Sequence, residues 1–542
     1  MTTTELPASD VNAYDFLIVG GGTAGCVVAS RLSEYLPNKR VLLIEAGPSD
    51  YQDDRVLLLK DWLSLLGGEL DYDYPTTEQP NGNSHIRHSR AKVLGGCSSH
   101  NTLISFRPFE YDCNRWVEQG AKGWDFKMFT RVIDNLRNTV QPVHTRHRNQ
   151  LCLDWVKSSS KAMDIPFIED YNQVIRDNGS IKQGVGFFNV SYNPDDGRRS
   201  SASVAYIHPI IRGDEKRPNL TILTNAWVSK INVAADKVTG INITLQDGTK
   251  YTLKAKAETI LCAGAVDTPR LMLLSGLGPK QQLSDLGIPV VHNLPGVGEN
   301  LLDHPESIIL WELNKPVPQN QTTMDSDAGI FLRREAPNAA GADGDIADIM
   351  AHCYQIPFVF NTSRLGYDKP KDAFCVTPNI PRPRSKGRIY LTSADPAVKP
   401  ALDFRYFTDP EGYDAATLVS CFKAARKIAQ QKPFADWIKR EIAPGPAIQS
   451  DEELSEYGRR VAHTVYHPAG TTKMGDVRSD ELAVVDPELR IRGLRGVRIA
   501  DAGVFPEMPS INPMLTVLGI GERAAELIAQ TWGWKGLEKQ KL

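Results

Sequence analysis

The spacing of apolar residues near the start of the chain predicts a strand, a helix and a second strand. Residues 14–19 (YDFLIV) form a short apolar run of the kind found in buried parallel strands. Residues 26–35 (CVVASRLSEY) place small and apolar side chains at helical spacing, and residues 40–44 (RVLLI) form a second apolar run. This order of elements indicates an α/β fold in which a helix covers a parallel sheet.

Glycines at fixed spacing join the first strand to the helix. Gly20, Gly22 and Gly25 follow the Gly-x-Gly-x-x-Gly pattern of dinucleotide-binding folds, in the strand-to-helix context that the pattern requires. The first glycine permits a tight turn, the second lets the backbone approach a pyrophosphate, and the third lets the helix pack close to the strand. We expect the start of the helix, with Thr23 and Ala24, to direct free N–H groups at the phosphates.

An acidic residue at the end of the second strand narrows the choice of nucleotide. Glu45 can accept hydrogen bonds from ribose hydroxyls, which favours NAD or FAD over NADP. No second glycine motif stands between a strand and a helix, which argues against a two-nucleotide reductase. Two later apolar strands, at 257–265 and 497–500, are expected to end beside the same cofactor, because ligands bind at the carboxyl ends of parallel strands.

Composition limits the class of protein. The 542 residues are too many for one ordinary core, so we expect two domains or one domain with insertions. The 62 Lys and Arg residues nearly balance the 65 Asp and Glu residues, which argues against binding to nucleic acid or to a membrane surface. The eight Cys residues show no Cys-x-x-Cys pair, so we expect buried free thiols and no metal site.

The two ends of the chain bear on its location. Residues 1–12 are polar and acidic and lack the features of a secretory signal, so we expect a protein that is not secreted. The final residues, Gln540-Lys541-Leu542, resemble a peroxisomal signal except that Gln replaces a small residue, and they fit a solvated tail equally well. The expected location is therefore cytoplasmic or peroxisomal.

A second glycine pair precedes an isolated histidine. Gly95 and Gly96 allow the backbone to approach a flat or charged group, and His100 follows without other metal ligands nearby. By itself such a histidine fits a turn or a core position. Because the upstream pattern predicts a dinucleotide-binding fold, we hypothesise that His100 anchors a flavin ring.

Four long motifs resemble the glucose–methanol–choline (GMC) family of flavoprotein oxidoreductases. They are residues 95–101 (GGCSSHN), 264–278 (GAVDTPRLMLLSGLG), 295–304 (PGVGENLLDH) and 501–506 (DAGVFP). The resemblance implies an α/β fold with a Rossmann-type FAD-binding domain, related to that of p-hydroxybenzoate hydroxylase, and a discontinuous α+β substrate-binding domain on an antiparallel sheet. It assigns residues 1–159, 203–311 and 464–542 to the FAD-binding domain, and residues 160–202 and 312–463 to the substrate-binding domain. It also implies a homodimer.

The same resemblance implies a set of cofactor-binding residues. His100 would form a covalent bond from its imidazole to the flavin 8α-methyl group, Tyr72 would lie near the flavin, and Val228 would contact the adenine. The backbone from Asn101 to Ile104 would surround the isoalloxazine. The other implied FAD contacts are Ala46, Val93, Gly95, Gly96, Thr102, Leu103, Asp501, Ala502, Asn512 and Pro513.

Stretches such as residues 78–83 (EQPNGN) and 464–468 (TVYHP) resemble the choline-oxidising subgroup of the family. This implies oxidation of choline through betaine aldehyde to glycine betaine, by hydride transfer to flavin N5, with O2 reduced to H2O2. His467 would be the catalytic acid–base residue and Asn512 a second polar catalytic residue, while His352 would help to hold the alkoxide. Thr102 stands beside the flavin where the subgroup has Ser.

A cation-binding group is implied at the other end of the substrate. Glu312 is a carboxylate among apolar residues (LWEL), which is costly to bury unless a charged partner faces it, and the resemblance makes that partner the trimethylammonium group of choline. Trp62 and Tyr466 match aromatic residues of the same site, which attract quaternary ammonium through their ring faces, and Val465 lies beside them.

The loop at residues 321–331 (QTTMDSDAGIF) departs from the subgroup because it lacks the expected pair of Trp residues. Asp325 or Asp327 could attract a cation at longer range, or the loop could be solvated. Three alternatives stay open on the sequence: a dehydrogenase that uses another electron acceptor, an oxidase of another primary alcohol, and a non-redox lyase of the same fold in which FAD is structural.

Overall fold

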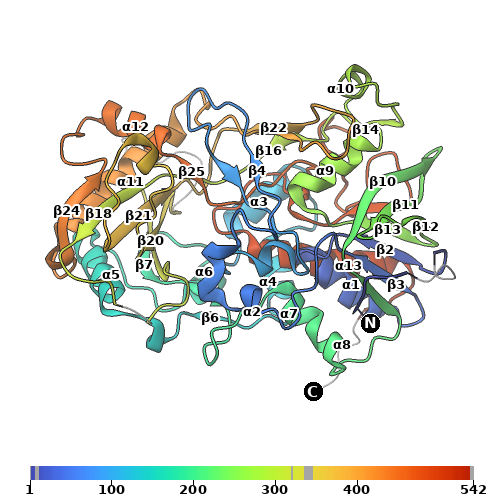
Figure 1. The fold of residues 1–542 in the computed structure, drawn as a ribbon, viewed down its shortest axis with the longest axis horizontal. Helices are drawn as coiled ribbons and strands as arrows, with labels where there is room; N and C mark the ends of the chain where they lie inside the picture. The colour runs from blue at the N-terminus through green and yellow to red at the C-terminus, as the bar shows by residue number, and fades with distance from the viewer. Residues whose placement is uncertain (1, 7–10, 319–320, 335–345, 537–542) are drawn as a thin grey trace.

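Two large sheets form the body of the protein. The computed structural model describes residues 2–6, 11–318, 321–334 and 346–536. Figure 1 shows a parallel sheet with its helices on the right and an antiparallel sheet with its helices on the left, joined by several crossings of the chain. The α/β fold class expected from the sequence is confirmed. The division into two domains at the predicted boundaries stays a prediction.

The first sheet is parallel throughout and is buried. Its strands run in the order β1 (Thr2–Thr3), β9 (Leu220–Leu223), β3 (Val41–Ile44), β2 (Phe16–Val19), β13 (Glu258–Leu261) and β26 (Val497–Ile499). Every residue of β2, β3 and β13 is buried, as expected for strands covered on both faces. The predicted early strands and both late strands therefore end at the same edge of one sheet.

Helix α1 (Thr23–Tyr35) begins within the glycine motif, between Gly22 and Gly25, and α13 (Met514–Thr531) packs along it. Gly25 permits the close contact between α1 and β2, because a Cβ at this position would lie 2.0 Å from the carbonyl oxygen of Gly20. Gly20 itself has a φ of 100°, a conformation that favours glycine. Both roles predicted for these two glycines are thus visible in the backbone.

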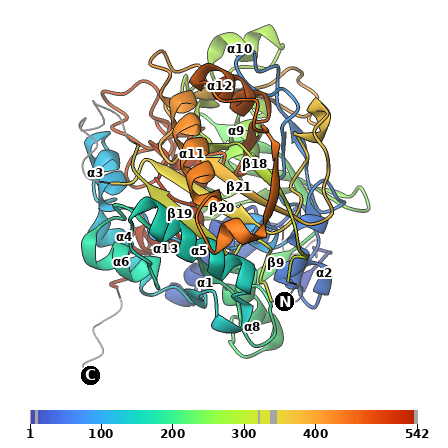
Figure 2. The same cartoon turned by 90° about the vertical axis from the view of Figure 1, so that its left-hand side faces the viewer.

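The second sheet is antiparallel. Its strands run in the order β24 (Ile438–Ala443), β18 (Ile309–Leu313), β21 (Ala373–Asn379), β20 (Ile349–Tyr354), β19 (Ala328–Leu332) and β7 (Gly184–Phe187), with the short β17 (Pro305–Glu306) and β25 (His463–Thr464) pairing beside them. Helices α5 (Gln150–Met163), α11 (Tyr413–Ala429) and α12 (Asp451–Arg460) lie over this sheet, in front of its strands in Figure 2. The expected antiparallel sheet is confirmed.

Shorter elements connect these layers. A third sheet contains β10 (Ala226–Ala234), β11 (Lys237–Leu245) and β12 (Lys250–Lys254). The remaining helices are α2 (Asp54–Leu57), α3 (Glu110–Glu118), α4 (Phe126–Ile133), α6 (Tyr171–Asn178), α7 (Ala202–Tyr206), α8 (His208–Arg212), α9 (Gly264–Leu274) and α10 (Lys280–Asp285). The remaining strands are β4 (Tyr74–Pro75), β5 (Arg87–His88), β6 (Val140–Pro142), β8 (Asn189–Ser191), β14 (Leu277–Gly278), β15 (His292–Asn293), β16 (Glu299–Leu301), β22 (Gly387–Tyr390) and β23 (Ala401–Asp403).

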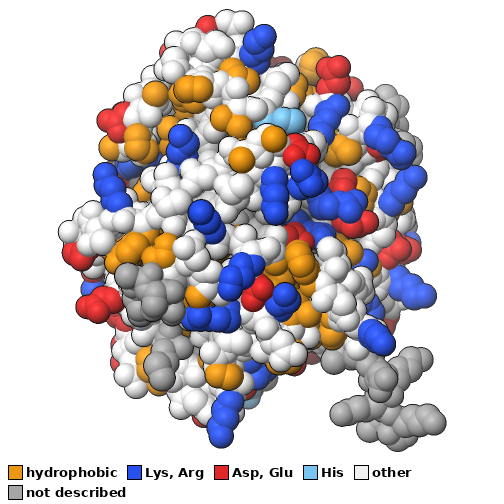
Figure 3. Space-filling view, turned by 90° about the vertical axis from the view of Figure 1, so that its right-hand side faces the viewer, with side chains coloured by type: hydrophobic (Ala, Val, Ile, Leu, Met, Phe, Trp, Pro, Cys, Tyr) orange, Lys and Arg blue, Asp and Glu red, His pale blue; other side chains and the backbone are white. Residues whose placement is uncertain are grey.

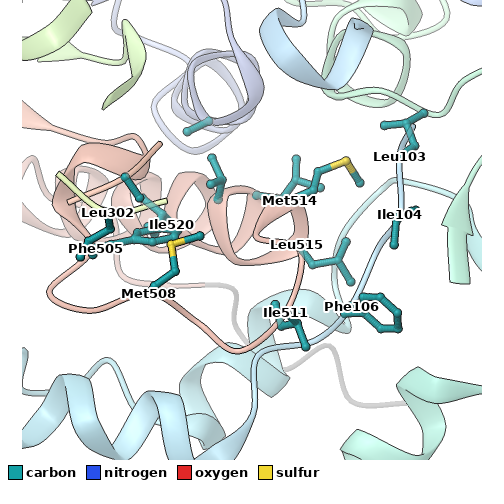
Figure 4. Packing of buried hydrophobic residues seen from close by; sticks show 14 of the residues in the cluster. Leu103, Ile104, Phe106, Leu302, Phe505, Met508, Ile511, Met514, Leu515 and Ile520 are labelled. Carbon is teal, nitrogen blue, oxygen red and sulfur yellow. The ribbon is translucent and has the colours of Figure 1, made fainter. Parts of the chain in front are cut away.

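The segment that leads into α13 is held by apolar packing. Ile511 and Leu515 lie close to Phe106 in Figure 4, and Leu103 and Ile104 come from the same strand-like segment as Phe106. All of these side chains are buried. This packing fixes the position of residue 512, between Ile511 and the start of the helix.

The surface and the ends add little to this picture. Figure 3 shows one face on which basic and acidic side chains are mixed and apolar patches are small. No helix in the described part of the chain is both long and apolar enough to cross a membrane. Seven of the eight cysteines are buried free thiols, and Cys97 is half-buried. The proposed signal at residues 540–542 lies outside the described residues.

Substitution of Gly25, with Gly22 as its control, tests the packing role within the glycine motif. Gly25→Ala should destabilise the protein by about 1–3 kcal/mol, because the new Cβ overlaps the Gly20 carbonyl and separates α1 from β2. Gly22→Ala is the matched control, since its Cβ would have no neighbour closer than 3.8 Å and its φ is −80°. Urea unfolding of the cofactor-free proteins should show a loss for Gly25→Ala alone. Equal stability of the two variants would contradict the packing role.

Candidate active site

A cavity extends from the carboxyl ends of β2 and β3 to β17 and β20 of the antiparallel sheet. It brings together most of the residues singled out from the sequence. Those that line it are Gly20, Gly22, Thr23, Ala24, Glu45, Ala46, Trp62, Tyr72, Gly96, His100, Asn101, Thr102, Leu103, Ile104, Val228, His352, Val465, Tyr466, His467, Asp501, Ala502, Asn512 and Pro513. Residues from the whole length of the chain therefore meet in one cavity.

Three of the predicted cofactor residues support the cavity wall from behind. Gly25 packs α1 against β2. Gly95 has a φ of 88° and donates its N–H to the carbonyl of Gly21 over 2.7 Å. Val93 is buried in a small apolar cluster with neighbours such as Leu65 and Leu70. None of the three lines the cavity, so the direct contacts expected of Gly95 and Val93 are not supported, whereas Gly25 has the packing position predicted for it.

The expectation that Glu312 faces the substrate is wrong. Its carboxylate lies on the outward side of β18 and forms ion pairs with Lys439 Nζ and Arg440 Nε, both over 2.7 Å. Arg440 lies directly opposite Glu312 on the paired strand β24. The cationic partner of Glu312 is therefore a neighbouring side chain and not the substrate. These two ion pairs lower the pKa of Glu312. Glu312 does not line the cavity.

Glu306 is the carboxylate that lines the substrate end of the cavity. It lies on β17, its side chain is only 2% exposed, and its Oε2 atom has no hydrogen-bond partner. Burial raises its pKa to about 8. The sequence analysis missed this residue, although it lies two residues after the motif that ends at His304 and shortly before an apolar run. This position beside the motif was the sequence signal that could have identified Glu306.

The nucleotide end of the cavity fits a dinucleotide. A Cβ on Gly96, whose φ is 54°, would lie 2.6 Å from the Cα of Gly22, so two backbone segments meet there without side chains. The first turn of α1 has no side-chain cap, which leaves its N–H groups available to phosphates. Glu45 lines the same end and accepts N–H groups of Gly21 and Gly47 over 2.9 and 2.8 Å.

Asp501 ties the last strand of the parallel sheet to the start of α9. It accepts hydrogen bonds from Gly264 N over 2.9 Å, from Thr268 Oγ1 over 2.6 Å and from Gly503 N over 2.8 Å. This network holds Ala502 at the cavity wall. The strand ends at 261 and 499 therefore close one side of the cavity together, as predicted from their position in a parallel sheet.

The His100 ring is buried and oriented by two hydrogen bonds. Nε2 lies 2.9 Å from the carbonyl of Leu65, which can only accept, so Nε2 carries the hydrogen and Nδ1 accepts from Ser89 Oγ at 3.1 Å. Burial lowers the pKa of His100 to about 4, so the ring is neutral at neutral pH. The neighbouring Asn101 side chain accepts the N–H of Leu103, which adopts a φ of 56° beside the cavity.

The hydrogen bonds of His304 define the tautomer of His467. His304 Nε2 lies 3.0 Å from the carbonyl oxygens of both Pro381 and Pro509, so this nitrogen carries a hydrogen. Burial lowers the pKa of His304 to about 4, and its neutral ring therefore has a lone pair on Nδ1. His467 Nδ1 lies 2.8 Å from His304 Nδ1 and must donate a hydrogen bond to its lone pair. The Nε2 atom of His467 is left unprotonated, as a proton acceptor.

Asp303 holds the segment that carries His467. Its Oδ1 atom accepts the backbone N–H of His467 over 2.9 Å, and its Oδ2 atom accepts hydroxyls of Thr464 and Tyr406 over 2.7 and 2.6 Å. Tyr466, between these anchored residues, has a φ of 63°, which is unusual for a residue other than glycine. The hydrogen bonds of Asp303 stabilise this conformation.

Polar atoms without partners gather opposite His467. Both ring nitrogens of His352 and the Oδ1 atom of Asn512 are buried and have no hydrogen bond. Burial lowers the pKa of His352 to about 3, and burial also holds the pKa of His467 well below its usual value. Buried polar groups are normally paired, so these atoms are suited to bind a polar group of a ligand.

Aromatic rings surround the end of the cavity near Glu306. Trp62 donates its Nε1–H to the carbonyl of Met324 over 2.9 Å, which ties it to the loop at residues 321–331. Tyr354 lies two residues after His352 on β20, and its ring stacks on Phe358 with centroids 5.0 Å apart. With Tyr466, these rings line the cavity. The sequence analysis did not identify Tyr354 or Phe358.

The acidic residues of the 321–331 loop have internal roles. Asp327 is fully buried and accepts hydrogen bonds from the backbone and hydroxyl of Thr323, from the hydroxyl of Thr322 and from the amide of Gln355. Asp325 is half-buried and neither residue lines the cavity. Among the residues with described positions, no group of three His, Cys, Asp or Glu could hold a metal ion.

Comparison with protein families identifies two matches. Residues 14–306 match the N-terminal model of GMC oxidoreductase, and residues 383–521 match the C-terminal model. Choline oxidase of Arthrobacter globiformis is 41% identical, covering 95% of this chain and 94% of that protein. Alcohol dehydrogenase [acceptor] of Pseudomonas putida and oxygen-dependent choline dehydrogenase of Staphylococcus saprophyticus are each 34% identical over 95% of this chain, covering 96% and 95% of those proteins.

Solved structures share the fold. Pyridoxine 4-oxidase from Mesorbium loti has a TM-score of 0.85 at 27% identity, covering 95% of this chain and 98% of that one. A formate oxidase has a TM-score of 0.84 at 22% identity, covering 96% of this chain and 98% of that one, and at this identity the likeness concerns the fold alone.

Proposed function

This chain belongs to the GMC oxidoreductase family, and we propose that it is an FAD-dependent choline oxidase that forms glycine betaine through betaine aldehyde, with O2 as the electron acceptor. One observation carries the proposal: the cavity holds a neutral histidine base at His467 and a carboxylate among aromatic rings at Glu306. Similarity to choline oxidase along nearly the whole chain supports the same substrate.

The histidine end of the cavity would bind and deprotonate the alcohol. The unprotonated Nε2 of His467 would accept the hydroxyl proton, and His304 would keep the ring in the required tautomer. His352 and Asn512, whose buried polar atoms lack partners, would hold the substrate oxygen, with Thr102 nearby on the cavity wall. Bound FAD would supply the acceptor for the hydride that leaves the carbinol carbon.

The glutamate end of the cavity would bind the trimethylammonium group. The Glu306 carboxylate would supply the opposite charge, and the faces of Trp62, Tyr466 and Tyr354 would attract the cation and exclude water. Val465 would fill the wall between the two ends. Tyr354 contributes an aromatic ring although the 321–331 loop lacks the Trp pair.

The cofactor would be FAD, held by the glycine motif, by Glu45 and by a covalent bond to His100. A neutral, buried imidazole is nucleophilic, and both of its hydrogen bonds fix the ring in the cavity wall. We also propose the domain division predicted above and a homodimer, both on the basis of the family resemblance.

A dehydrogenase that transfers electrons to an acceptor other than oxygen is the second candidate. The similarity to an alcohol dehydrogenase [acceptor] favours this candidate. The residues that bind and deprotonate the alcohol would serve either reaction.

Flavin spectra and peroxide measurements test the activity. Anaerobic addition of choline should bleach the flavin absorbance, and admission of air should restore it with release of H2O2. Slow reoxidation in air, with fast reoxidation by an artificial acceptor, would favour the dehydrogenase. A flavin that stays oxidised with choline but is bleached by a neutral primary alcohol would contradict the choline proposal.

Substitution of Glu306, with Glu312 as a matched control, tests the charge at the substrate end of the cavity. Glu306→Gln should raise KM for choline at least about tenfold, equivalent to about 1.4 kcal/mol, because a cation loses its counterion in a buried site. It should change KM for the neutral isostere 3,3-dimethylbutan-1-ol much less. Glu312→Gln is the control and should leave both values unchanged, since its carboxylate pairs with Lys439 and Arg440 at the surface. A larger effect at Glu312 would reverse the assignment.

Acid precipitation tests the bond to His100. The yellow colour should stay with the precipitated protein, because a covalent bond survives denaturation. In His100→Asn, the flavin should still bind to the native protein but should enter the supernatant on precipitation. Release of the colour from the unaltered protein would rule out the covalent bond.

A further inference from the structure

The surroundings of Glu306 leave its charge without compensation. Its neighbours across the two adjoining strands are Asn379 on β21 and His463 on β25. Within the described part of the chain, no Lys or Arg forms an ion pair with Glu306, and its Oε2 atom has no hydrogen-bond partner. An isolated buried carboxylate is costly, and such a group usually takes up a proton instead.

His463 does not supply the missing positive charge. Its Nδ1 atom lies 2.7 Å from the carbonyl of Thr464 and therefore carries a hydrogen, while its Nε2 atom lies 3.3 Å from the Tyr466 hydroxyl and can accept from it. Both nitrogens are thus satisfied by a neutral ring. Burial lowers the pKa of His463 to about 4, so the ring stays neutral although Nδ1 is 3.8 Å from Glu306 Oε1.

The other groups around Glu306 disfavour its ionised form or are neutral. Burial is the largest effect and raises the pKa of Glu306; the Thr377 hydroxyl lowers it, and the Asp303 carboxylate raises it further. Tyr354 and Tyr466 are buried phenols whose pKa values lie above the usual range, so they are uncharged. His463, Asp303, Tyr354 and Tyr466 are therefore each neutral or negative.

We propose that Glu306 carries a proton when the substrate site is empty, and that the cationic head of the substrate displaces this proton. The inference rests on the proposed function, because it requires a cationic substrate at this end of the cavity. The balance is simple: a protonated carboxyl group and a free cation become a carboxylate–cation pair, and one proton passes to the solvent. The buried site thus has the same net charge before and after binding, which avoids leaving an uncompensated charge in either state.

The direction of the pH dependence follows from the same balance. Below the pKa of Glu306, which burial places at about 8, the empty site holds the proton and cation binding must release it. The affinity for a cation should therefore rise by about tenfold per pH unit up to that value and become constant above it. A neutral ligand of the same shape should show no such slope.

Calorimetry of the flavin-containing protein tests the proposal. The probe is tetramethylammonium, which has no hydroxyl and cannot be oxidised. At pH 7, its binding enthalpy in phosphate and in MOPS should differ by the amount expected for release of about one proton. Near pH 10, carbonate and CAPS should give equal binding enthalpies, because the carboxyl group is already ionised. Infrared difference spectra should show loss of a protonated-carboxyl band on binding.

Two variants test whether the released proton comes from Glu306. Glu306→Gln should abolish both the proton release and the infrared change, and should weaken tetramethylammonium binding at least about tenfold. Glu312→Gln, the surface control, should behave as the unaltered protein. The flavin spectrum of each variant checks that the cavity is intact. Loss of proton release in Glu312→Gln as well would overturn the assignment to Glu306.

Two outcomes separate this inference from the proposed function. Tetramethylammonium binding without proton release at pH 6 and 7 would show that Glu306 is already ionised, which overturns the inference and leaves the choline proposal intact. Failure of tetramethylammonium to bind, while tert-butanol binds, would overturn both, because the site would then prefer a neutral group.

Discussion

The carboxylate of Asp303 is the interaction on which the geometry of the cavity depends. It accepts hydrogen bonds from Tyr406, Thr464 and the backbone of His467, which lie 103, 161 and 164 residues further along the chain. The adjacent His304 sets the tautomer of His467, and Glu306 follows two residues later. One short segment therefore positions the base, determines where its proton lies and supplies the carboxylate at the other end of the cavity. A shift of this segment would disturb all three together.

The sequence predicted the nucleotide half of the molecule well, because the physical requirements there are local. Gly25 is needed by its contact with the nearby Gly20 carbonyl, Gly20 by its own φ of 100°, and Glu45 ends the strand next to them. The long motifs then indicated the GMC family, and the resemblance to that family gave the candidate residues of the cavity. His467 and His352 do line one cavity, although their separate patterns in the sequence say nothing of their distance.

The sequence did not show in the same way whether Glu306 or Glu312 lines the cavity. Both stand among apolar residues, and the local pattern does not reveal which of them a distant strand will cover. Glu312 is directed to the surface by pairing with β24, which brings Lys439 and Arg440 from 127 and 128 residues away. Glu306 stays inside because its strand ends after two residues, between β21 and β25. Tertiary pairing, rather than local composition, decides the chemistry at each position.

The order of strands in the parallel sheet also constrains how the protein is made. The sheet takes strands from residues 2–3 and from residues 497–499, and the cavity also requires Asn512 beyond them. A ribosome releases the chain from its N-terminus, so β2 and β3 emerge long before the strand that completes their sheet. The wall formed by Asp501 and Ala502 closes only after both residues have left the ribosome. A flavin that needs this wall would therefore enter the cavity only after residue 502 has been synthesised.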